Sequence, residues 1–438
     1  MRKSTTIVIL FITLLGCNSG KNLVETPVND DLIQVQNALS ELNEVLKKDN
    51  GALWNFKLDG PILFINRDTR AIIANEADEK GELHKQGKCY VGKFPEANNI
   101  ANTAGEWHGK KWTMVALPLP DTRAERLDLL IHESFHRIQP LIGFDSLHEI
   151  QNNHLDEKLA RIYLKLELEA LKMALSTDKP LEHIKNALLF REYRQQIYAG
   201  AKASENSLEI HEGLAAYTGT ILSGKSDQEL KKHYCKRIES LYNRPTFVRS
   251  FAYFTIPVYG YFIQKKAKNW NLEISKRTNL TDFIMNFYGL SPQAISEEKI
   301  KEIGQIYNID SISTFEEKRE QEQIKIVDNY KAKLLSDSAL QISLIKMSIG
   351  FNPGNITPLD SFGTVYPYAR ISDTWGILKV DSGGVLLSPD WKLATVSKPR
   401  QVSDSLIIGK GWNIKLNEGW ILENKNGKYG LVKKDNHP

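Results

Sequence analysis

The spacing of apolar residues predicts a helix followed by a small sheet near the start of the folded chain. Between residues 30 and 48, apolar side chains recur every three or four positions, which is the period of an amphipathic helix. The segment 98–109 is polar and is expected to be a loop. Short apolar runs bounded by turn-forming residues predict three strands, at residues 62–65, 71–74 and 112–117.

The middle of the chain, from about residue 122 to 287, has helical periodicity throughout, and charged helical sequence continues to about residue 335. No repeat of fixed length is visible, so a repeat architecture is not expected. Clusters of glycine, proline and serine divide the region into several helices, with expected breaks at residues 140–143, 176–180, 200–207 and 224–227.

The pattern changes from about residue 360, where short apolar runs alternate with hairpin-turn sequences such as Asn426-Gly427. Four of the eight tryptophans fall here, and a packed core is favoured over an aromatic ligand-binding platform because buried aromatics are the usual case. The predicted fold class is α+β, with a mainly helical domain at 30–340 that carries a small N-terminal sheet, and a small β domain at 360–438. The strands of the latter are expected at residues 375–380, 384–387, 391–397, 412–416, 420–423 and 429–433.

Composition and charge are those of a globular protein without a nucleic-acid partner. Hydrophobic residues make up 41% of the chain and charged residues 25%. The formal net charge is only +4, and lysine pairs such as Lys231-Lys232 are isolated instead of forming a basic stripe. Three cysteines lack the CxxC spacing of a metal site. Two of them, Cys89 and Cys235, are left free to form one disulfide or none.

The N-terminus has the features of a bacterial export signal. Two basic residues precede an apolar run that is too short to span a bilayer as a helix. The run ends in Leu14-Leu15-Gly16-Cys17, which resembles the lipobox of bacterial lipoproteins. This resemblance implies a signal peptide at 1–16, a lipid on Cys17 and a tether at 17–29. We therefore expect a lipid-anchored protein of the bacterial cell envelope that contacts the membrane through its lipid and faces the periplasm or the cell exterior; an ordinary secretory signal is the alternative.

The segment 129–138, Leu-Leu-Ile-His-Glu-Ser-Phe-His-Arg-Ile, carries the candidate chemistry. His132 and His136 are four residues apart, so on a helix both imidazoles lie on one face, one turn apart. This spacing suits one zinc ion with bonds of about 2.0–2.1 Å to nitrogen. Glu133 lies on the adjacent part of the helix surface, where its carboxylate can reach a water molecule at the metal without binding the metal.

The surroundings of this HExxH motif support a helix with two different sides. Thr122 and Glu125 form a capping box before it, and Pro140 ends it. The histidines face roughly away from the apolar stripe, so one side can enter the core while the other lines a cleft. The stripe consists of Leu127, Leu130, Ile131, Phe135 and Ile138.

A catalytic zinc site needs a third protein ligand and an open position for water. The segment His211–Gly219, His-Glu-Gly-Leu-Ala-Ala-Tyr-Thr-Gly, resembles the second zinc motif of gluzincin peptidases, in which a helix presents a glutamate followed by small residues. The resemblance implies that His132, His136 and Glu212 bind Zn²⁺ and that Glu133 is the catalytic base. It covers two short motifs and not the whole chain.

Small residues near Glu212 have an expected packing role. Gly213, Ala215 and Ala216 would let their helix approach the HExxH helix closely, and Ser207 is the expected cap of that helix.

The chain also departs from the zinc-peptidase patterns. Ile142 occupies the position where metzincins have a further histidine. Ala215 and Ala216 stand where many gluzincins have an aspartate that orients a ligand histidine, so that supporting group is unidentified. Arg137 follows the second histidine, where an uncharged residue is usual.

Three other glutamates remain alternatives to Glu212. Glu157 follows His136 at a spacing near that of shorter gluzincins, although a solvated helix start is the better interpretation of it. Glu167 and Glu169 lie in a leucine-rich helix, where a glutamate is costly to bury unless it is paired.

Peptide hydrolysis also needs a donor to the oxyanion besides the metal. The gluzincin resemblance implies a tyrosine or histidine downstream of the third ligand, and the aromatic segment 250–261 offers Tyr253 and Tyr259. A buried structural role is an equal alternative for each tyrosine. The strand 112–117, just before the HExxH helix, is expected to pair with an extended substrate.

The leading hypothesis is a zinc-dependent metallopeptidase domain at 30–340 that acts on a peptide or protein substrate outside the cytoplasm. One alternative is a catalytically silent zinc-binding surface lipoprotein whose tryptophan-rich C-terminal domain binds a partner. The intact Glu133 argues against this alternative, because a silent site has no use for that carboxylate. The other alternative is a zinc hydrolase with a non-peptide substrate.

Overall fold

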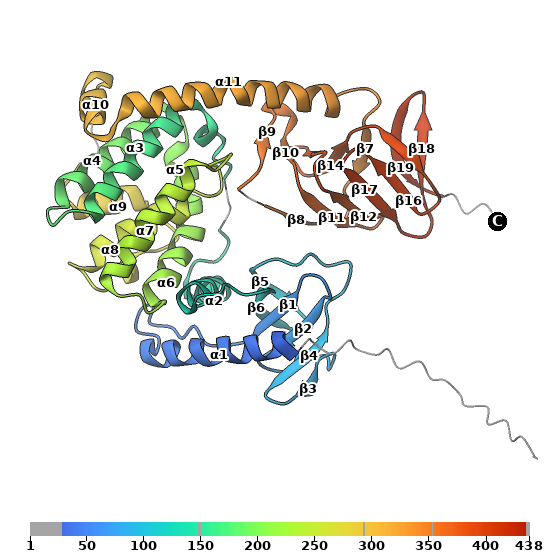
Figure 1. The fold of residues 1–438 in the computed structure, drawn as a ribbon, viewed down its shortest axis with the longest axis horizontal. Coiled ribbons are helices and arrows are strands. Elements are labelled where there is room, and N and C mark those ends of the chain that lie inside the picture. Colours follow the sequence, from blue (N-terminus) through green and yellow to red (C-terminus); the bar gives the residue numbers. More distant parts are fainter. Residues whose placement is uncertain (1–28, 148–149, 292–293, 353, 435–438) are drawn as a thin grey trace, which may run out of the picture.

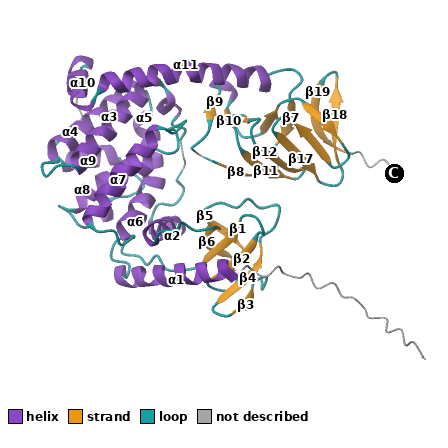
Figure 2. Cartoon of the chain, viewed as in Figure 1, coloured by secondary structure: helices purple, strands orange, loops and turns teal. Residues whose placement is uncertain are grey.

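The computed structural model describes residues 29–147, 150–291, 294–352 and 354–434 and has the expected α+β architecture (Figures 1 and 2). A helical part lies on one side of the molecule, and two β parts lie on the other side, one above the other (Figure 1). The predicted signal peptide, the lipidation site Cys17 and the tether up to residue 28 lie outside the described residues. None of the described helices is long and apolar enough to cross a membrane.

The chain begins with α1 (Asn29–Asp49) and a six-stranded sheet in the order β3-β4-β2-β1-β6-β5. Central strand β1 pairs antiparallel with β2 and parallel with β6. The sheet differs from the prediction in two ways. The polar segment 98–109, which was expected to be a loop, contains the edge strand β5, and strands β3 and β4 had not been predicted. The strands are β1 (Ile62–Asn66), β2 (Ala71–Ala74), β3 (His84–Gln86), β4 (Cys89–Lys93), β5 (Thr103–Trp107) and β6 (Lys110–Leu117).

Both faces of this sheet are buried, which explains why its central strands are continuous apolar runs. Successive side chains of a strand point to opposite faces. On β1, Phe64 packs into the large core that also contains α1 and α2, whereas its neighbours Leu63 and Ile65 pack into a second cluster with Trp112. The sheet is thereby fixed against the helix that carries the HExxH motif.

The helical part is built around two adjacent helices, α3 and α4, and α2 lies between it and the N-terminal sheet (Figure 1). The segment 200–207 had been expected to be a break, but it forms α5 because a buried ionic network holds it. The α-helices are α2 (Arg123–Ile138), α3 (Lys158–Leu175), α4 (Leu181–Ile197), α5 (Ala201–Leu208), α6 (Leu214–Leu222), α7 (Asp227–Tyr242), α8 (Ala252–Gln264), α9 (Leu280–Phe287), α10 (Glu297–Gly304) and α11 (Ile309–Leu334).

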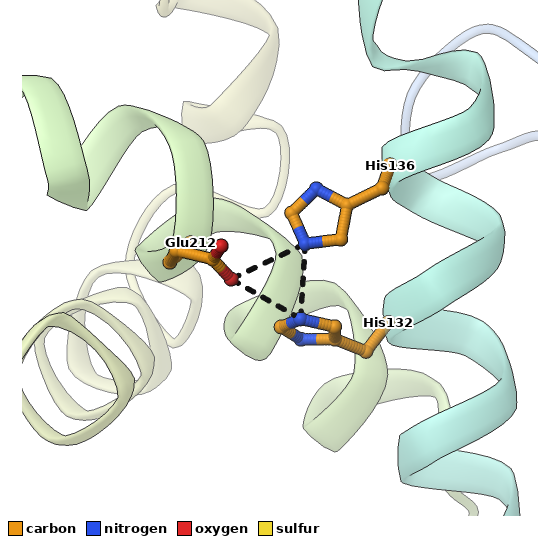
Figure 3. A group of neighbouring side chains, drawn as sticks. All are labelled: His132, His136 and Glu212. Atoms are coloured by element: carbon orange, nitrogen blue, oxygen red, sulfur yellow. Dashed lines mark hydrogen bonds and ion pairs between the residues drawn. The ribbon is translucent and has the colours of Figure 1, made fainter. Parts of the chain in front are cut away.

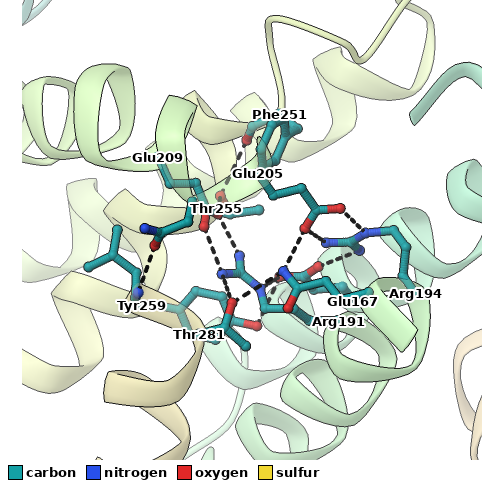
Figure 4. Close-up of polar contacts among 12 residues, drawn as sticks. Glu167, Arg191, Arg194, Glu205, Glu209, Phe251, Thr255, Tyr259 and Thr281 are labelled. Carbon is teal, nitrogen blue, oxygen red and sulfur yellow. Dashed lines mark hydrogen bonds and ion pairs between the residues drawn. The ribbon is translucent and has the colours of Figure 1, made fainter. Parts of the chain in front are cut away.

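Fully buried arginines and glutamates join α3, α4 and α5 (Figure 4). Arg191 Nε donates to Glu167 Oε1 at 2.8 Å, and its two Nη atoms donate to Glu209 at 2.7 and 3.0 Å. Arg194 binds the other oxygen of Glu167 at 2.7 Å and donates twice to Glu205 at 2.8 Å. Each charge has oppositely charged partners, as burial of an ion requires.

Replacing Arg191 with methionine is expected to lower the free energy of unfolding by about 3–5 kcal/mol, because Glu167 and Glu209 would each lose a buried partner. Urea denaturation of the purified chain measures the change. Lys158→Met is the control, since Lys158 makes partly exposed ion pairs with Glu317 and Glu320, and this variant should unfold at a urea concentration close to that of the wild type. An Arg191→Met variant that unfolds at the urea concentration of the wild type would contradict the prediction.

The C-terminal β part consists of two packed sheets, in the orders β18-β19-β7-β14-β13-β10-β9 and β15-β16-β17-β12-β11-β8. Its first strand, β7, pairs with β14, so this part begins at residue 340 and not at about 360. The strands are β7 (Leu340–Ser343), β8 (Ser348–Phe351), β9 (Thr357–Pro358), β10 (Thr364–Tyr366), β11 (Ala369–Asp373), β12 (Gly376–Val380), β13 (Val385–Leu387), β14 (Leu393–Val396), β15 (Pro399–Val402), β16 (Leu406–Gly409), β17 (Trp412–Leu416), β18 (Trp420–Lys425) and β19 (Lys428–Lys433).

The tryptophans of this part belong to its core, as predicted. Trp375 and Trp412 are buried, and Trp391 and Trp420 pack against the same cluster from its edge. The helix α11 runs along the top of the molecule from the helical part to these sheets (Figure 1).

The C-terminal β part also contacts the loop between β4 and β5. Arg370 on β11 donates to Asn99 Oδ1 at 2.9 Å, and Asn99 Nδ2 donates to Ser348 on β8 at 3.0 Å. Ser372 adds a hydrogen bond to the carbonyl of Ala97 at 2.6 Å. The two β parts are therefore joined directly as well as through the helices.

The two cysteines inside the fold have free thiols: Cys89 is buried on β4, and Cys235 is half-buried on α7. The disulfide that the sequence left open is not formed.

Candidate metal centre

Three donor atoms from two distant parts of the sequence meet at one point (Figure 3). The Nε2 atoms of His132 and His136 are 3.0 Å apart, and Glu212 Oε2 lies 3.4 Å from the first and 3.2 Å from the second. The three side chains are largely buried, with exposed fractions of 11, 11 and 13%. The structure thus brings together the three residues that the two sequence motifs single out.

The geometry of this triangle fits one small metal ion. Four ligands placed tetrahedrally at about 2.0–2.2 Å from zinc lie roughly 3.3–3.6 Å from one another, and the observed sides are close to this value. Two imidazole nitrogens and one carboxylate oxygen are also a donor set found in catalytic zinc sites, with the fourth position open. The residues present therefore fit a metal ion of this type.

The position of α2 follows from its cap and from its close contact with α6. The Thr122 hydroxyl accepts from the Glu125 backbone N–H and donates to the Glu125 carboxylate. A Cβ on Gly219 of α6 would lie 2.5 Å from the Asp128 carbonyl of α2. Close packing of the two motif-bearing helices thus depends on Gly219, whereas Gly213, which had been assigned that role, approaches Ile256 of α8 instead.

Arg137, whose charge departs from the gluzincin pattern, is buried on the side of α2 that faces the N-terminal sheet. Its guanidinium donates to the carbonyls of Leu58 and Asp59 at 2.8 and 2.9 Å and to the Thr113 hydroxyl at 3.3 Å. The neighbouring Gly60 has no room for a side chain, because a Cβ there would lie 2.5 Å from Arg137 Cζ. Arg137 therefore fastens α2 to the sheet.

Glu212 lies in a π-helical turn, Glu209–Gly213, between α5 and α6. The N–H of Leu214 bonds to the carbonyl of Glu209, five residues earlier. Ser207, the expected cap of this helix, lies inside α5 instead, because the helix continues without a break from residue 201. Single π turns of this kind are often found at functional sites.

Gln139 supplies the supporting group that had not been identified from the sequence. Its side-chain oxygen lies 3.0 Å from His136 Nδ1 and can accept its proton in a hydrogen bond, which leaves Nε2 free for a metal. The amide nitrogen donates to the carbonyls of Ile210 and His211 at 3.0 and 3.1 Å. One side chain thus orients a ligand on α2 and holds the turn that carries Glu212.

Replacing Gln139 with leucine is expected to lower the affinity for a metal ion, measured with Zn²⁺ as the probe, by about 10–100-fold, because His136 would lose the acceptor that orients its ring. Competition with a chromophoric chelator measures the affinity. The same substitution at Gln305, an exposed residue after α10, is the control and should leave the affinity unchanged. Wild-type affinity in the Gln139→Leu variant would show that the hydrogen bond has no role in metal binding.

The charges of the three donors are strongly coupled. Burial lowers the pKa of His136, but Glu212 more than offsets this effect, so that the pKa is raised to about 9. Burial raises the pKa of Glu212, but the two imidazoles outweigh the effect of burial and hold the pKa of Glu212 well below its ordinary value. The site therefore stabilises one positive charge beside the carboxylate, and a metal cation can replace the proton as that charge.

Glu133 and Tyr253 line both arms of the cleft in which the triangle lies. Glu133 is buried, which raises the pKa of its carboxyl. The hydroxyl of Tyr253 on α8 donates to Glu212 Oε2, and its ring stacks on His132 with centroids 5.6 Å apart. Burial and the Glu212 carboxylate raise the pKa of Tyr253 well above its ordinary value, so the hydroxyl stays a donor.

The second tyrosine candidate, Tyr259, is not brought to the site. It is fully buried, and its hydroxyl donates to Glu167 in the ionic network at 3.0 Å. The prediction of a catalytic role for Tyr259 is corrected accordingly, since α8 turns this side chain toward α3.

The rival glutamates are likewise engaged elsewhere. Glu167 is held by Arg191 and Arg194, and Glu169 accepts from Lys172 and Tyr242. Glu157 stands at the start of α3. In the part of the chain that the structure describes, the group of His132, His136 and Glu212 is the one set of three such side chains whose donor atoms converge.

The candidate metal centre lies where two arms of a cleft meet. The larger arm has a volume of about 1090 Å³ and the smaller arm about 350 Å³, and both are lined by His132, Glu133 and Tyr253. The larger arm also reaches β8 and β11 of the C-terminal part. Open space therefore extends from the donor triangle in two directions.

Strand β6 cannot receive a substrate strand, because it lies between β1 and β5 in the sheet. This corrects the expectation for residues 112–117. The edge of the sheet is β5, and Asn102, Thr103 and Ala104 at its start line the smaller arm. The free edge beside the cleft thus belongs to a segment that the sequence pattern had indicated as a loop.

Two further residues of the site had no role assigned from the sequence. His211 stands next to Glu212 in the second motif, and its ring centroid lies 4.9 Å from that of His136 in the smaller arm. Asn102 lines both arms and accepts from the Ala116 backbone N–H at 2.9 Å. His211 could have been predicted from its position next to Glu212 in the second motif. No feature of the local sequence indicates that Asn102 lies at the site.

Comparisons with protein-family models, with curated proteins and with solved structures find no match to this chain. The functional interpretation therefore depends on the arrangement of the site itself. Within it, His132, His136 and Glu212 form a group that can hold a metal ion.

Proposed function

We propose that the chain is a zinc-dependent peptidase of gluzincin type that hydrolyses peptide bonds in its two-armed cleft. The observation that carries the proposal is the triangle of His132, His136 and Glu212, with sides of 3.0–3.4 Å and with Glu133 next to it in the same cleft. A structural zinc site is usually closed by four protein ligands. Three ligands beside a buried glutamate and an open cleft favour catalysis.

In this mechanism each protein residue has a separate task. Zinc, when bound, acidifies a water molecule and polarises the substrate carbonyl. Glu133 takes the proton of the attacking water on a carboxylate oxygen and passes it to the leaving amine. The Tyr253 hydroxyl donates a hydrogen bond to the oxyanion that develops on the carbonyl oxygen. Gln139 keeps His136 in the tautomer that the site needs.

The edge strand β5 supports a peptide as the substrate. An extended peptide can pair with the free N–H and C=O groups of an edge strand, and this pairing recognises the main chain regardless of side chains. Thr103 and Ala104 of β5 line the smaller arm, which also contains His136 and Glu212. A peptide paired with β5 would therefore pass beside the donor triangle.

The proposal is tested on the purified chain by digestion of a peptide library, read by mass spectrometry, together with the zinc content by elemental analysis. Support would be about one zinc per chain and cleavage that a chelator abolishes and added zinc restores. Stoichiometric zinc without hydrolysis would overturn the proposal in favour of a binding module. Chelator-sensitive hydrolysis of esters but not of peptides would overturn it in favour of another zinc hydrolase.

Replacing Tyr253 with phenylalanine is expected to lower kcat by about 100-fold with zinc content unchanged, because one oxyanion donor is lost. Steady-state kinetics on a peptide found in the library measures the effect. Tyr259→Phe is the matched control: it removes the same hydroxyl from the same helix, but from a residue bonded to Glu167, and kcat should stay near that of the wild type. Equal effects of both substitutions would contradict a role of Tyr253 in the reaction.

A further inference from the structure

Arginines from three separate parts of the chain line the larger arm of the cleft. Two come from the turn between β1 and β2, two from α7 and the turn after it, and one from β11. They are Arg67, Arg70, Arg237, Arg244 and Arg370.

Some of these guanidiniums are fixed by neutral groups, which leaves their charge in place. Arg70 donates to the carbonyls of Phe94 and Asn98 at 3.1 and 2.6 Å, and its one carboxylate neighbour, Glu96, is 3.7 Å away and mostly exposed. Arg370 donates to Asn99. Carbonyl and amide oxygens orient a guanidinium without supplying a negative charge.

Two of the arginines have no acidic partner in the part of the chain that the structure describes. Among the described residues, no carboxylate lies within ion-pair distance of Arg67 or Arg244, and both side chains are exposed in the cleft. Arg244 and Arg237 approach the ring of Phe254 at 5.2 and 5.4 Å, so two like charges share one wall. Partial burial and the cation of Arg237 lower the pKa of Arg244.

The acidic residues that line this arm, Glu125, Asp128 and Glu133, are fewer than its five arginines. Asp128 lies 3.5 Å from Arg237 and 3.6 Å from His233. Burial, Arg237 and Lys225 nevertheless lower the pKa of His233 to about 4, although Asp128 faces the ring. Burial is the largest cause of this shift, and the cations of Arg237 and Lys225 add to it.

The smaller arm has a different character. Apart from the residues of the metal centre and the cation Lys111, its wall is mostly apolar or neutral, as in Thr103, Ala104, Pro140 and Phe144. The two arms of the cleft that extend from the donor triangle therefore differ in charge.

We propose that the larger arm binds an acidic segment of the substrate, so that the preferred peptides carry aspartate or glutamate on the one side of the scissile bond that occupies this arm. The inference rests on the proposed peptidase function, which it extends to a substrate class. Exposed arginines attract and orient acidic side chains most strongly at low ionic strength, because salt screens such charges.

Binding tests the inference without turnover. A fluorescent peptide with three glutamates and its glutamine analogue are titrated into the Glu133→Gln variant at low and at high salt. We expect the acidic peptide to bind at least about tenfold more tightly at low salt, with a smaller preference at high salt. Equal affinities, or a single-stranded oligonucleotide that binds more tightly than the acidic peptide, would overturn the inference.

Charge reversal locates the acidic subsite. The Arg67→Glu/Arg244→Glu variant, in the same Glu133→Gln background, should lose the preference for the acidic peptide. The matched control, Lys398→Glu/Arg400→Glu, makes the same change of net charge at a pocket on the C-terminal β part and should keep the preference. Loss of preference in both variants would assign it to net charge and overturn the inference.

Cleavage by the wild-type chain separates this inference from the proposed function. Acidic residues enriched on one side of the cleaved bonds support both. Cleavage without acidic enrichment overturns the inference alone, whereas the absence of any peptide cleavage overturns the proposed function.

Discussion

Replacing Glu133 with glutamine is expected to lower kcat/KM for peptide hydrolysis by about 10³-fold, within the range of 10²–10⁴ that general base catalysis contributes. An amide fills the same space as the carboxylate but cannot take a proton. Zinc content should not change, because Glu133 does not belong to the group of three converging donors. Kinetics and elemental analysis on the same preparation measure both quantities.

Glu169→Gln is the matched control for this substitution. Glu169 lies on α3, where it accepts from Lys172 and Tyr242, so its replacement should leave kcat/KM within about twofold. A Glu133→Gln variant with more than about a tenth of the wild-type kcat/KM would show that another group takes the proton, because even the lower limit for a general base exceeds that loss.

Replacing Glu212 with alanine is expected to lower the zinc affinity by more than about 100-fold and to abolish hydrolysis. Replacing a residue that only orients a metal ligand lowers the metal affinity by about 10–100-fold, and Glu212→Ala would remove one of the proposed ligands itself. Only His132 and His136 would remain, and two imidazoles hold zinc weakly. Competition titration with a chelator measures the affinity.

Alanine at Glu157 or at Glu169 serves as the control, since both were alternatives for the third ligand and neither converges with the histidines. Both variants should bind zinc like the wild type. If the Glu212→Ala variant kept near-normal affinity, the third ligand would have to be another group, and the interpretation of the triangle would be wrong.

The metal centre could be predicted because its signals are local in the sequence. The spacing of four positions from His132 to His136 places both rings on one helical face, and the capping residue Thr122 lies in the same segment. Glu212 is likewise marked by the small residues that follow it. The α+β class could be predicted for the same reason, since apolar periodicity is also a local property.

The remaining features depend on contacts between distant segments. Tyr253 and Tyr259 are six residues apart on α8 and so lie on different faces, and only the packing of that helix decides which of them meets the metal centre. The order of the strands also depends on distant contacts. Residues 103–107 form the edge of the sheet because they pair with β6, and no local sequence pattern indicates this pairing.

The buried ionic network and the C-terminal wall of the cleft illustrate the same limit. Arg191 and Glu209 are charged residue types that usually lie on a solvent-exposed helix face. Their burial follows only from how α3, α4 and α5 pack together. Arg370 lies about 160 residues beyond Glu212, yet the β part that carries it completes the larger arm of the cleft.

The wide turn at Glu209–Gly213 assigns two acidic residues to two unrelated tasks. In a regular helix, residues three apart share a face. Here the extra width lets Glu209 accept from Arg191 of the ionic network. Glu212 faces the two imidazoles (Figure 3). Deleting a single residue would restore the regular period and turn one of the two carboxylates away from its partner. We therefore expect natural variants to differ in this segment by substitution and not by insertion or deletion.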